Sequence, residues 1–193
     1  MNFLSHLYLS GDSEGLLIGN FIADSVKGST FNNFSPEVQK GILLHRKIDS
    51  FTDAHPIVEI SKKRLRPKYK KYSSVIIDIY YDHYLAVNWE NYSDKSLDEY
   101  TRDVYTLIEK HKHTFPLKSQ LFTKYMLEYN ILSAYAHFEG IERVLQGMSR
   151  RASFVSNMEN AIHDLKEHYP LFENEFKAFF PELQKFINTQ IQI

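Results

Sequence analysis

The chain has 193 residues, no cysteine and a formal net charge of -1 at pH 7. This length fits one domain, which we assign to residues 1–193, and the lack of cysteine excludes disulfides, thiolate catalysis and cysteine-based zinc sites. A net charge near zero gives no overall field that favours nucleic acid or a membrane surface, so neither is an expected partner. The apolar start MNFLSHLYLSGDSEG lacks the basic region and cleavage site of a signal peptide, and no apolar run approaches the roughly 20 residues that span a bilayer. We therefore expect a cytoplasmic protein.

Apolar residues recur at helical spacing along the whole chain, which predicts an all-α fold of seven to nine helices. The first helix is expected to begin after residues 12–13 and to stop at Gly28, because glycine is favourable just beyond a helix C-terminus. The second begins with Ser35 as its N-cap and Pro36 in its first turn, and it ends before the HPI segment.

The third helix is expected over about residues 56–66, because Pro67 should end it. The next segment, SSVIIDIYYDHYLAVNW, has a β-branched and aromatic core that could form a strand. Its apolar run continues beyond Asp82, and Asp78 stands four residues earlier, which favours a helix. The sequence SLDE then has the capping-box pattern at the start of another helix. Later helices are expected over about residues 117–136, 138–149, 153–168 and 170–190.

Polar residues stand in several of these apolar stretches, four residues apart and therefore on one helical face. They are Asn20 and Asp24, then His45, Asp49 and Asp53, then Asp78, Asp82 and the adjacent His83, with His6 inside FLSHLYL. Burying an unpaired carboxylate costs several kcal/mol, so solvated surface explains this recurrence poorly. If the helices converge, a divalent cation would relieve the repulsion, and imidazole with carboxylate suits Mn, Fe, Zn or Mg. Such a site favours phosphoester hydrolysis.

Each of these residues also has a structural explanation. A single histidine on an apolar face, such as His6 or His45, is more often a hydrogen-bonded core residue than a ligand. Asp24 and Asp49 could pair with nearby basic side chains, and Asp53 could favour the turn at DAHP. These explanations are reasonable one at a time, and the number of such residues together favours a functional site.

A basic run, KKRLRPKYKK, places seven Lys or Arg among residues 62–71. Such runs are more often a solvated face than a binding site. This run lies between the His45 helix and the Asp78 helix, so it should lie near the proposed centre, where it would steer an anionic substrate or an acidic protein. Few aromatic residues are interleaved with it and no nucleic-acid module is apparent.

Several ordered segments resemble the acyl carrier protein phosphodiesterases, also called ACP hydrolases. They are MNFLSHLYLS, GNFIADSVKG, GILLHRKIDSFTD, DIYYDHYLAVNW and VLQGMSRR, and the resemblance continues through DLKEHYPLFENEFKAFFPEL to about residue 185. It implies a noncanonical HD-domain-like helical fold, with the DH order at residues 82–83 reversing the usual HD pair. It also implies hydrolysis of the phosphodiester that joins 4'-phosphopantetheine to a serine of holo-acyl carrier protein, with Mn(II) as the typical metal and Fe(II), Mg(II) or Zn(II) as alternatives.

The polar positions of the family have counterparts here, and we assign roles to them on that basis. The expected metal ligands are Asp24, His45, Asp49, Asp78 and Asp82. The expected catalytic residues are His6, Asp53 and His83. The expected docking residues for the acidic acyl carrier protein are Lys62, Lys63, Arg64, Arg66, Lys68, Lys70 and Lys71. The competing hypotheses are an HD-like phosphohydrolase acting on a nucleotide or another small phosphoester, and a non-catalytic helical protein that binds an acidic partner.

Overall fold

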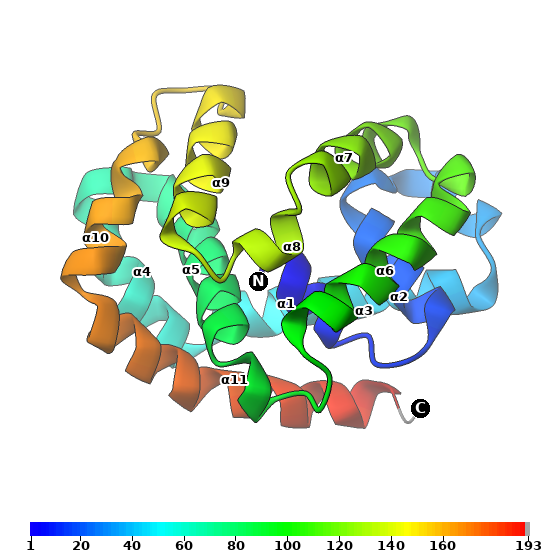
Figure 1. The fold of residues 1–193 in the computed structure, drawn as a ribbon, viewed down its shortest axis with the longest axis horizontal. Coiled ribbons are helices and arrows are strands. Elements are labelled where there is room, and N and C mark those ends of the chain that lie inside the picture. Colours follow the sequence, from blue (N-terminus) through cyan, green and yellow to red (C-terminus); the bar gives the residue numbers. More distant parts are fainter. Residues whose placement is uncertain (192–193) are drawn as a thin grey trace.

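A computed structural model of the chain describes residues 1–191, and this part is all-α, with no strand (Figure 1). The helices are α1 (Phe3–Tyr8), α2 (Glu14–Ile22), α3 (Pro36–Ala54), α4 (Pro56–Tyr69), α5 (Ser73–Val87), α6 (Leu97–His111), α7 (Leu117–Glu128), α8 (Ile131–Ala134), α9 (Phe138–Arg151), α10 (Ala161–Glu167) and α11 (Tyr169–Ile191). The predicted fold class is therefore confirmed, and the number of helices in residues 1–191 exceeds the predicted seven to nine by two. No helix in this part combines the length and apolar character needed to cross a membrane.

The helix starts follow the capping signals of the sequence. Ser13 accepts a hydrogen bond from the backbone N–H of Leu16 at the start of α2, and Ser35 caps α3 ahead of Pro36 in its first turn. At the start of α6, Ser96 and Glu99 form the reciprocal bonds of a capping box. The apolar segment before residue 88 is the helix α5 rather than a strand. These predictions depend on contacts within a few residues, and all of them are confirmed.

Several predicted boundaries are wrong, and two of the errors account for the additional helices. The short helix α1 was not expected, and the segment 117–136 is divided into α7 and α8 because Asn130 adopts a left-handed backbone conformation with φ of 44°. Another left-handed residue, Asn157, precedes α10, so only the second half of the predicted helix 153–168 is α-helical.

Two predicted helix ends are also wrong. The helix α2 ends at Ile22 and passes into a 3-10 turn, six residues before Gly28. In contrast, α4 continues through Pro67 to Tyr69. Pro67 lacks an N–H and so removes one bond of the helical ladder, and the buried side chains of Leu65 and Tyr69 hold the last turns in place.

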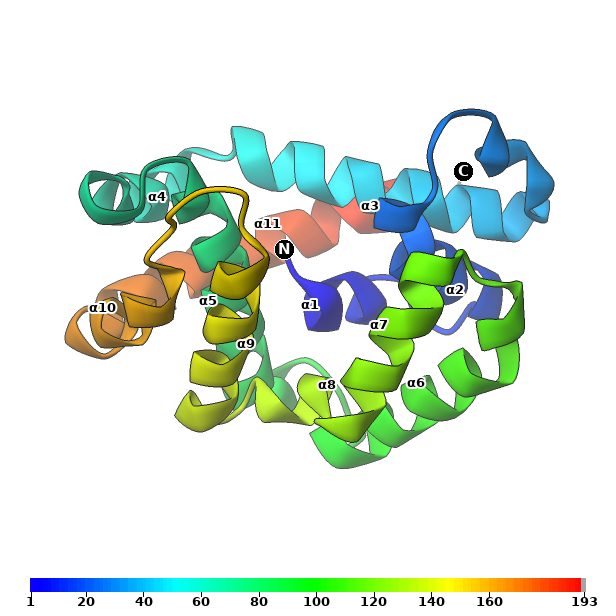
Figure 2. The same ribbon diagram turned by 90° about the horizontal axis from the view of Figure 1, so that it is seen from above.

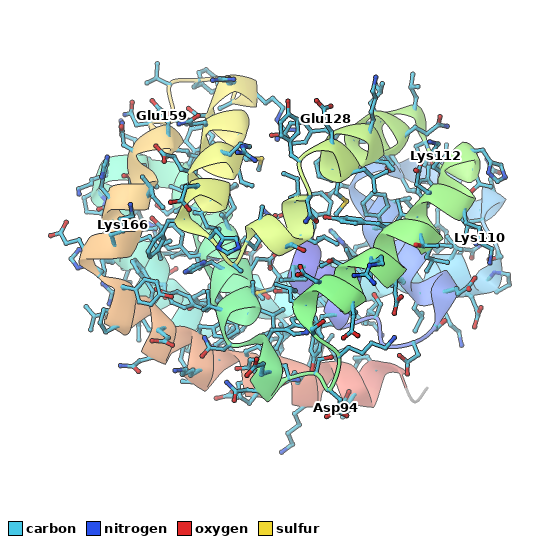
Figure 3. The ribbon with its side chains drawn as sticks, viewed as in Figure 1. Asp94, Lys110, Lys112, Glu128, Glu159 and Lys166 are labelled. Atoms are coloured by element: carbon cyan, nitrogen blue, oxygen red, sulfur yellow. The ribbon has the colours of Figure 1, made fainter. Side chains whose placement is uncertain are left out.

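The helices surround the N-terminal segment. Figure 2 shows α1 near the middle of the molecule, with the long helix α3 along the upper side of the view and α11 packed against α3. The helix α1 packs against α2 and α5, while α11 packs against α3, α4 and α5. The buried apolar side chains form one contiguous cluster with many aromatic rings from α5 and α11. Charged side chains such as Lys110, Glu128 and Lys166 point outward from the helices (Figure 3).

The closest helix contact is between α2 and α3, and it depends on two glycines. A Cβ atom on Gly19 would lie 2.1 Å from the carbonyl oxygen of Val38, and one on Gly41 would lie 2.3 Å from the carbonyl oxygen of Leu16. Both distances are far inside van der Waals contact, so only glycine permits this approach. The contact brings Asn20, the residue after Gly19, close to His45 on α3.

Candidate metal centre

Six of the eight expected ligands and catalytic residues line a single pocket of about 350 Å³. They are His6 from α1, Asp24 from the turn after α2, His45, Asp49 and Asp53 from α3, and Asp78 from α5. The predicted convergence of three polar helical faces is therefore observed, and α1 contributes a further histidine. A larger hollow of about 720 Å³, lined by residues such as Tyr8, Asp94 and Tyr100, contains no histidine, so size alone does not mark the functional site.

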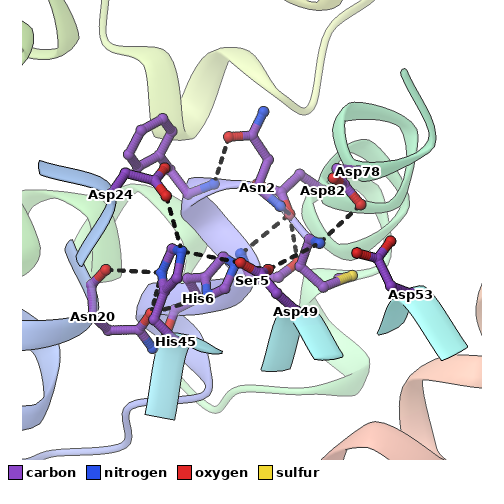
Figure 4. A network of polar contacts seen from close by, with 12 residues as sticks. Asn2, Ser5, His6, Asn20, Asp24, His45, Asp49, Asp53, Asp78 and Asp82 are labelled. Atoms are coloured by element: carbon purple, nitrogen blue, oxygen red, sulfur yellow. Dashed lines mark hydrogen bonds and ion pairs between the residues drawn. The ribbon is translucent and has the colours of Figure 1, made fainter. Parts of the chain in front are cut away.

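The carboxylate of Asp49 contacts the Nε2 atoms of two histidines, His6 and His45, in this pocket (Figure 4). Its Oδ1 is 3.1 Å from His6 Nε2, and its Oδ2 is 3.2 Å from His45 Nε2. The two imidazole rings are stacked with their centres 4.0 Å apart. Asp24, at the exposed edge, places Oδ1 3.4 Å from His45 Nε2. Ligand atoms of His6, His45 and Asp49 all lie within 4.8 Å of one another, a spacing that a single ion can span.

The charges in this cluster depend strongly on one another. Burial opposes a charge on His45, but hydrogen bonds to Asp24 and Asp49 outweigh it and raise the pKa of His45 to about 9. Burial and the neighbouring His45 charge lower the pKa of His6 to about 4. Burial alone would raise the pKa of Asp49, yet its bonds from His45 and His6 hold it well below its ordinary value. At neutral pH, His45 is therefore charged and His6 is neutral.

The ring nitrogens of His6 and His45 carry fewer protons in total than they have contacts with oxygen atoms. Nδ1 of each ring faces Asn20 Oδ1, and Nε2 of each ring faces Asp49, so four nitrogens face oxygen atoms. A neutral imidazole carries one N–H and an imidazolium carries two, which gives three protons for four contacts. One nitrogen lone pair therefore faces an oxygen acceptor. A divalent cation stabilises that arrangement, so these residues fit a metal site made of imidazole and carboxylate.

Asp78 and Asp53 lie in the same pocket but have other cationic partners. The amino group of Met1 is 2.8 Å from Asp78 Oδ1 and 3.9 Å from Asp49 Oδ1. Asp53 forms an ion pair with Lys62, with 2.7 Å between Oδ1 and Nζ. Burial raises the pKa of Asp78 despite the nearby Met1 ammonium. These two carboxylates therefore stand beside the His6–His45–Asp49 cluster rather than within it.

The structure does not bring Asp82 or His83 to the pocket, which corrects their expected roles. Asp82 is fully buried and accepts hydrogen bonds from the backbone N–H groups of Asn2, Leu4 and Ser5, so its oxygens anchor the N-terminus of α1. Burial raises the pKa of Asp82 to about 6, although these bonds oppose the rise. His83 faces another direction, because adjacent residues of a helix point about 100° apart. Its ring contacts Tyr135 O at 2.7 Å and Tyr169 OH at 3.0 Å.

Most of the basic run forms ion pairs within the molecule. Lys62 is buried against Asp53, so it faces the pocket edge rather than solvent. The other pairs are Arg64 with Glu175, Arg66 with Glu59 and Lys68 with Asp164. In residues 1–191, Lys63, Lys70 and Lys71 are exposed and form no ion pair. The exposed positive charge is therefore smaller than the sequence suggests.

One residue of the pocket, Asn20, has no assigned role in the sequence-based prediction. Its side chain contacts both pocket histidines, and it is almost completely buried. The four-residue spacing from Asp24 was the available signal. It showed a polar helical face, but it could not show that the amide would lie between residues 6 and 45.

The fold and pocket define an all-α protein with a histidine–carboxylate centre. The family model described as "Acyl carrier protein phosphodiesterase" matches residues 1–183. The chain belongs to this family.

Curated relatives agree over nearly the full length. The acyl carrier protein phosphodiesterase of Yersinia enterocolitica serotype O:8 / biotype 1B is 33% identical over 184 residues, covering 95% of this chain and 95% of the relative. That of Photorhabdus laumondii subsp. laumondii is 33% identical over 186 residues, covering 96% and 94%. That of Pectobacterium atrosepticum is 31% identical over 191 residues, covering 98% and 99%. No solved structure matches the chain, so the HD-like arrangement stays a prediction.

Proposed function

We propose that this protein hydrolyses the phosphodiester joining 4'-phosphopantetheine to a serine of holo-acyl carrier protein, and that it does so in the cytoplasm. Water adds to phosphorus, the bond from phosphorus to the serine oxygen breaks, and that oxygen gains a proton, which leaves the apo protein and free 4'-phosphopantetheine. The observation that carries this proposal is the His6–His45–Asp49 cluster, set in one pocket of a chain that belongs to the phosphodiesterase family.

We assign the metal to His6 Nε2, His45 Nε2 and Asp49, with Asp24 as a further ligand at the exposed edge. A divalent ion held there would supply Lewis-acid activation of water and of the phosphoryl group. Mn(II) is our first choice, and Fe(II), Mg(II) and Zn(II) have compatible ligand chemistry. His6 thus moves from the expected catalytic residues to the ligands.

Asp53 remains our candidate for moving a proton to or from the reacting oxygens. It lines the same pocket, and its side chain is 68% exposed, so solvent protons can reach it. Its partner Lys62 holds the carboxylate in place. Asp78, paired with the Met1 amino group, is assigned to shaping the opposite wall rather than to metal binding.

The acyl carrier protein is proposed to dock beside the pocket on Lys63, Lys70 and Lys71. Lys70 and Lys71 immediately precede α5, whose residues Ser74 and Val75 line the pocket. Lys71 Nζ lies 4.4 Å from the centre of the Phe154 ring. Positive charge at the pocket edge suits an acidic protein that must present its prosthetic group to the centre.

An apolar contact adjoins these lysines. Phe154 is 69% exposed and Val155 is 88% exposed, and both follow α9, which contributes Met148 to the pocket wall. Exposed apolar side chains of this size, surrounded by charge, are typical of an interaction site.

The reaction is tested by mass spectrometry of holo-acyl carrier protein incubated with the purified protein and Mn(II). We expect loss of the phosphopantetheine mass and no loss with the Asp49→Asn variant. Cleavage of nucleotides or of other small phosphoesters, with holo-acyl carrier protein left intact, would replace this proposal with the general phosphohydrolase. Binding of holo-acyl carrier protein without any cleavage would support the non-catalytic binder.

The docking surface is tested by reversing the three exposed charges together as Lys63→Glu, Lys70→Glu and Lys71→Glu. We expect KM for holo-acyl carrier protein to rise roughly tenfold or more at low salt, from about 0.5 kcal/mol for each exposed pair, and the difference to shrink at high salt. The matched control reverses three exposed lysines of other helices, Lys40, Lys118 and Lys185. Equal KM values for the two triple variants would remove this surface.

A further inference from the structure

We propose that Asn20 is a positioning residue that fixes the tautomer of both pocket histidines, so that each presents the lone pair of Nε2 to the metal. This inference rests on the proposed metal site and assigns a specific role to a residue that touches neither the metal nor the substrate.

The orientation of the Asn20 amide is fixed by the carbonyl oxygen of His6, which can only accept. Asn20 Nδ2 lies 2.7 Å from the carbonyl oxygen of His6, which has no proton to donate. It also lies 3.0 Å from Ser10 Oγ, and that hydroxyl donates its own proton to the same His6 carbonyl at 2.9 Å. Turning the amide over would place two oxygens against each other at hydrogen-bond distance. Nδ2 must therefore point to His6 O, and Oδ1 must point the other way.

Asn20 Oδ1 consequently faces both imidazoles as an acceptor. It lies 2.9 Å from His6 Nδ1 and 3.0 Å from His45 Nδ1. An amide oxygen has two lone pairs and can accept from both rings. When a metal replaces the contact between Nε2 and Asp49, Nδ1 is the protonated nitrogen of each ring, and Asn20 Oδ1 accepts from both. The stacking of the two rings makes this shared acceptor possible, because it places both Nδ1 atoms on the same side.

The two histidines do not depend equally on this side chain. His45 Nδ1 also lies 3.1 Å from the backbone oxygen of Asn20, which any residue at position 20 retains. In residues 1–191, His6 Nδ1 has no acceptor other than Asn20 Oδ1. Replacing Asn20 should therefore release the tautomer of His6 while that of His45 stays fixed. General damage to the fold would affect the tautomers of both histidines, rather than that of His6 alone.

The test is long-range proton–nitrogen NMR of the histidine rings in the protein loaded with Zn²⁺. The wild-type protein should show a protonated Nδ1 on both His6 and His45, with Zn²⁺ bound through Nε2 of each ring. Assignments come from the His6→Gln and His45→Gln variants. A lone pair on Nδ1 of either ring in the wild-type protein would overturn the proposal without any variant at position 20.

Two variants then test the cause. Asn20→Leu should lose the fixed tautomer of His6 only and bind Zn²⁺ about 10- to 100-fold more weakly, the usual effect of removing a partner behind a ligand. Asn88→Leu is the control, since Asn88 also bonds a backbone carbonyl but lies outside the pocket. A His6 tautomer unchanged in Asn20→Leu would also overturn the proposal. Because the tautomers are measured without substrate, failure of the phosphodiesterase assay would leave this result standing.

Discussion

Within residues 1–191, two groups of histidine and carboxylate have the spacing of a metal site, and they differ in what surrounds them. One is the pocket cluster of His6, His45 and Asp49, and the other is the α10 cluster of Asp164, Glu167 and His168. The oxygens of Asp164 are already bound, with Lys68 Nζ at 2.6 Å and Tyr69 OH at 2.5 Å. In the pocket, Asp49 is bound mainly by the two histidines that would share the metal with it.

The difference shows that spacing is a weak criterion for a metal site and that the partners of each oxygen are a stronger one. A lysine ammonium beside a carboxylate satisfies its charge without any ion. Imidazoles can exchange their Nε2 protons for a metal, so a cluster neutralised by histidine can release protons and bind a cation. The α10 cluster also lies within two turns of one helix, whereas the pocket cluster requires α1 and α3 to be brought together.

The largest expected effect comes from removing the central carboxylate of each cluster in turn. Asp49→Asn should reduce Zn²⁺ affinity by more than the roughly 100-fold typical of losing a partner behind a ligand, and should abolish cleavage of holo-acyl carrier protein. Asp164→Asn should leave Zn²⁺ binding unchanged and lower the free energy of unfolding by about 1–3 kcal/mol, because Lys68 and Tyr69 lose a buried acceptor. Calorimetric titration with Zn²⁺ and urea denaturation measure the two quantities. Loss of metal from Asp164→Asn alone would reverse the comparison.

A smaller effect is expected from pH in the metal-free protein. The folded-state pKa of His45 is about 9 against an ordinary value of 6.5, so its charged form stabilises the fold below pH 6.5 and this stabilisation is lost as the pH rises towards 9. The loss should be of the order of 3 kcal/mol in the free energy of unfolding. Urea denaturation at several pH values measures it, with His45→Gln expected to lose the slope and His168→Gln to keep it. A slope that persists in His45→Gln would assign it to another group.

The smallest effect is expected from widening the contact between α2 and α3. This contact supports the pocket cluster and has no part in the α10 cluster. Gly19→Ala places a methyl group against the backbone of α3, so the helices must separate, at a cost of about 1–3 kcal/mol in the free energy of unfolding. Zn²⁺ affinity should fall with it, because Asn20 and His45 move apart. Gly147→Ala is the matched control, since its nearest neighbours lie at 3.5 and 3.9 Å and alanine favours a helix interior by up to about 1 kcal/mol. Thermal and urea denaturation of both variants would show whether the two glycines differ in this way.

The sequence predicted well which residues of α3 share a polar face, and less well which carboxylates lie outside the pocket. The row of His45, Asp49 and Asp53 follows from helical spacing, and all three do line the pocket. Asp82 was expected there because it stands four residues after Asp78. It is instead held by the backbone of α1, a helix that was not predicted. Spacing along one helix cannot show which other element satisfies a carboxylate.

The basic run at residues 62–71 shows the same limit of sequence-based prediction. Its seven charges are plain in the sequence. Four of them form ion pairs, and the partner of Arg64, Glu175, is 111 residues away along the chain. Each pair depends on how α4 packs against α3, α10 and α11, which local composition does not encode. The unpaired positive charge at the surface is therefore limited to Lys63, Lys70 and Lys71, which this packing leaves exposed.

By itself, the sequence determined the helical class, the helix starts at Ser13, Ser35 and Ser96, and the polar face of α3, because capping bonds and helical periodicity involve residues only a few positions apart. Only the tertiary structure decided that His6 joins that face, that Asp82 anchors α1, and that Asn20 lies between two imidazoles. Those outcomes depend on the approach of separate helices, which Gly19 and Gly41 allow through close backbone contact. The physical reason is that a buried polar group must find its partner in space, and that partner is set by packing rather than by distance along the chain.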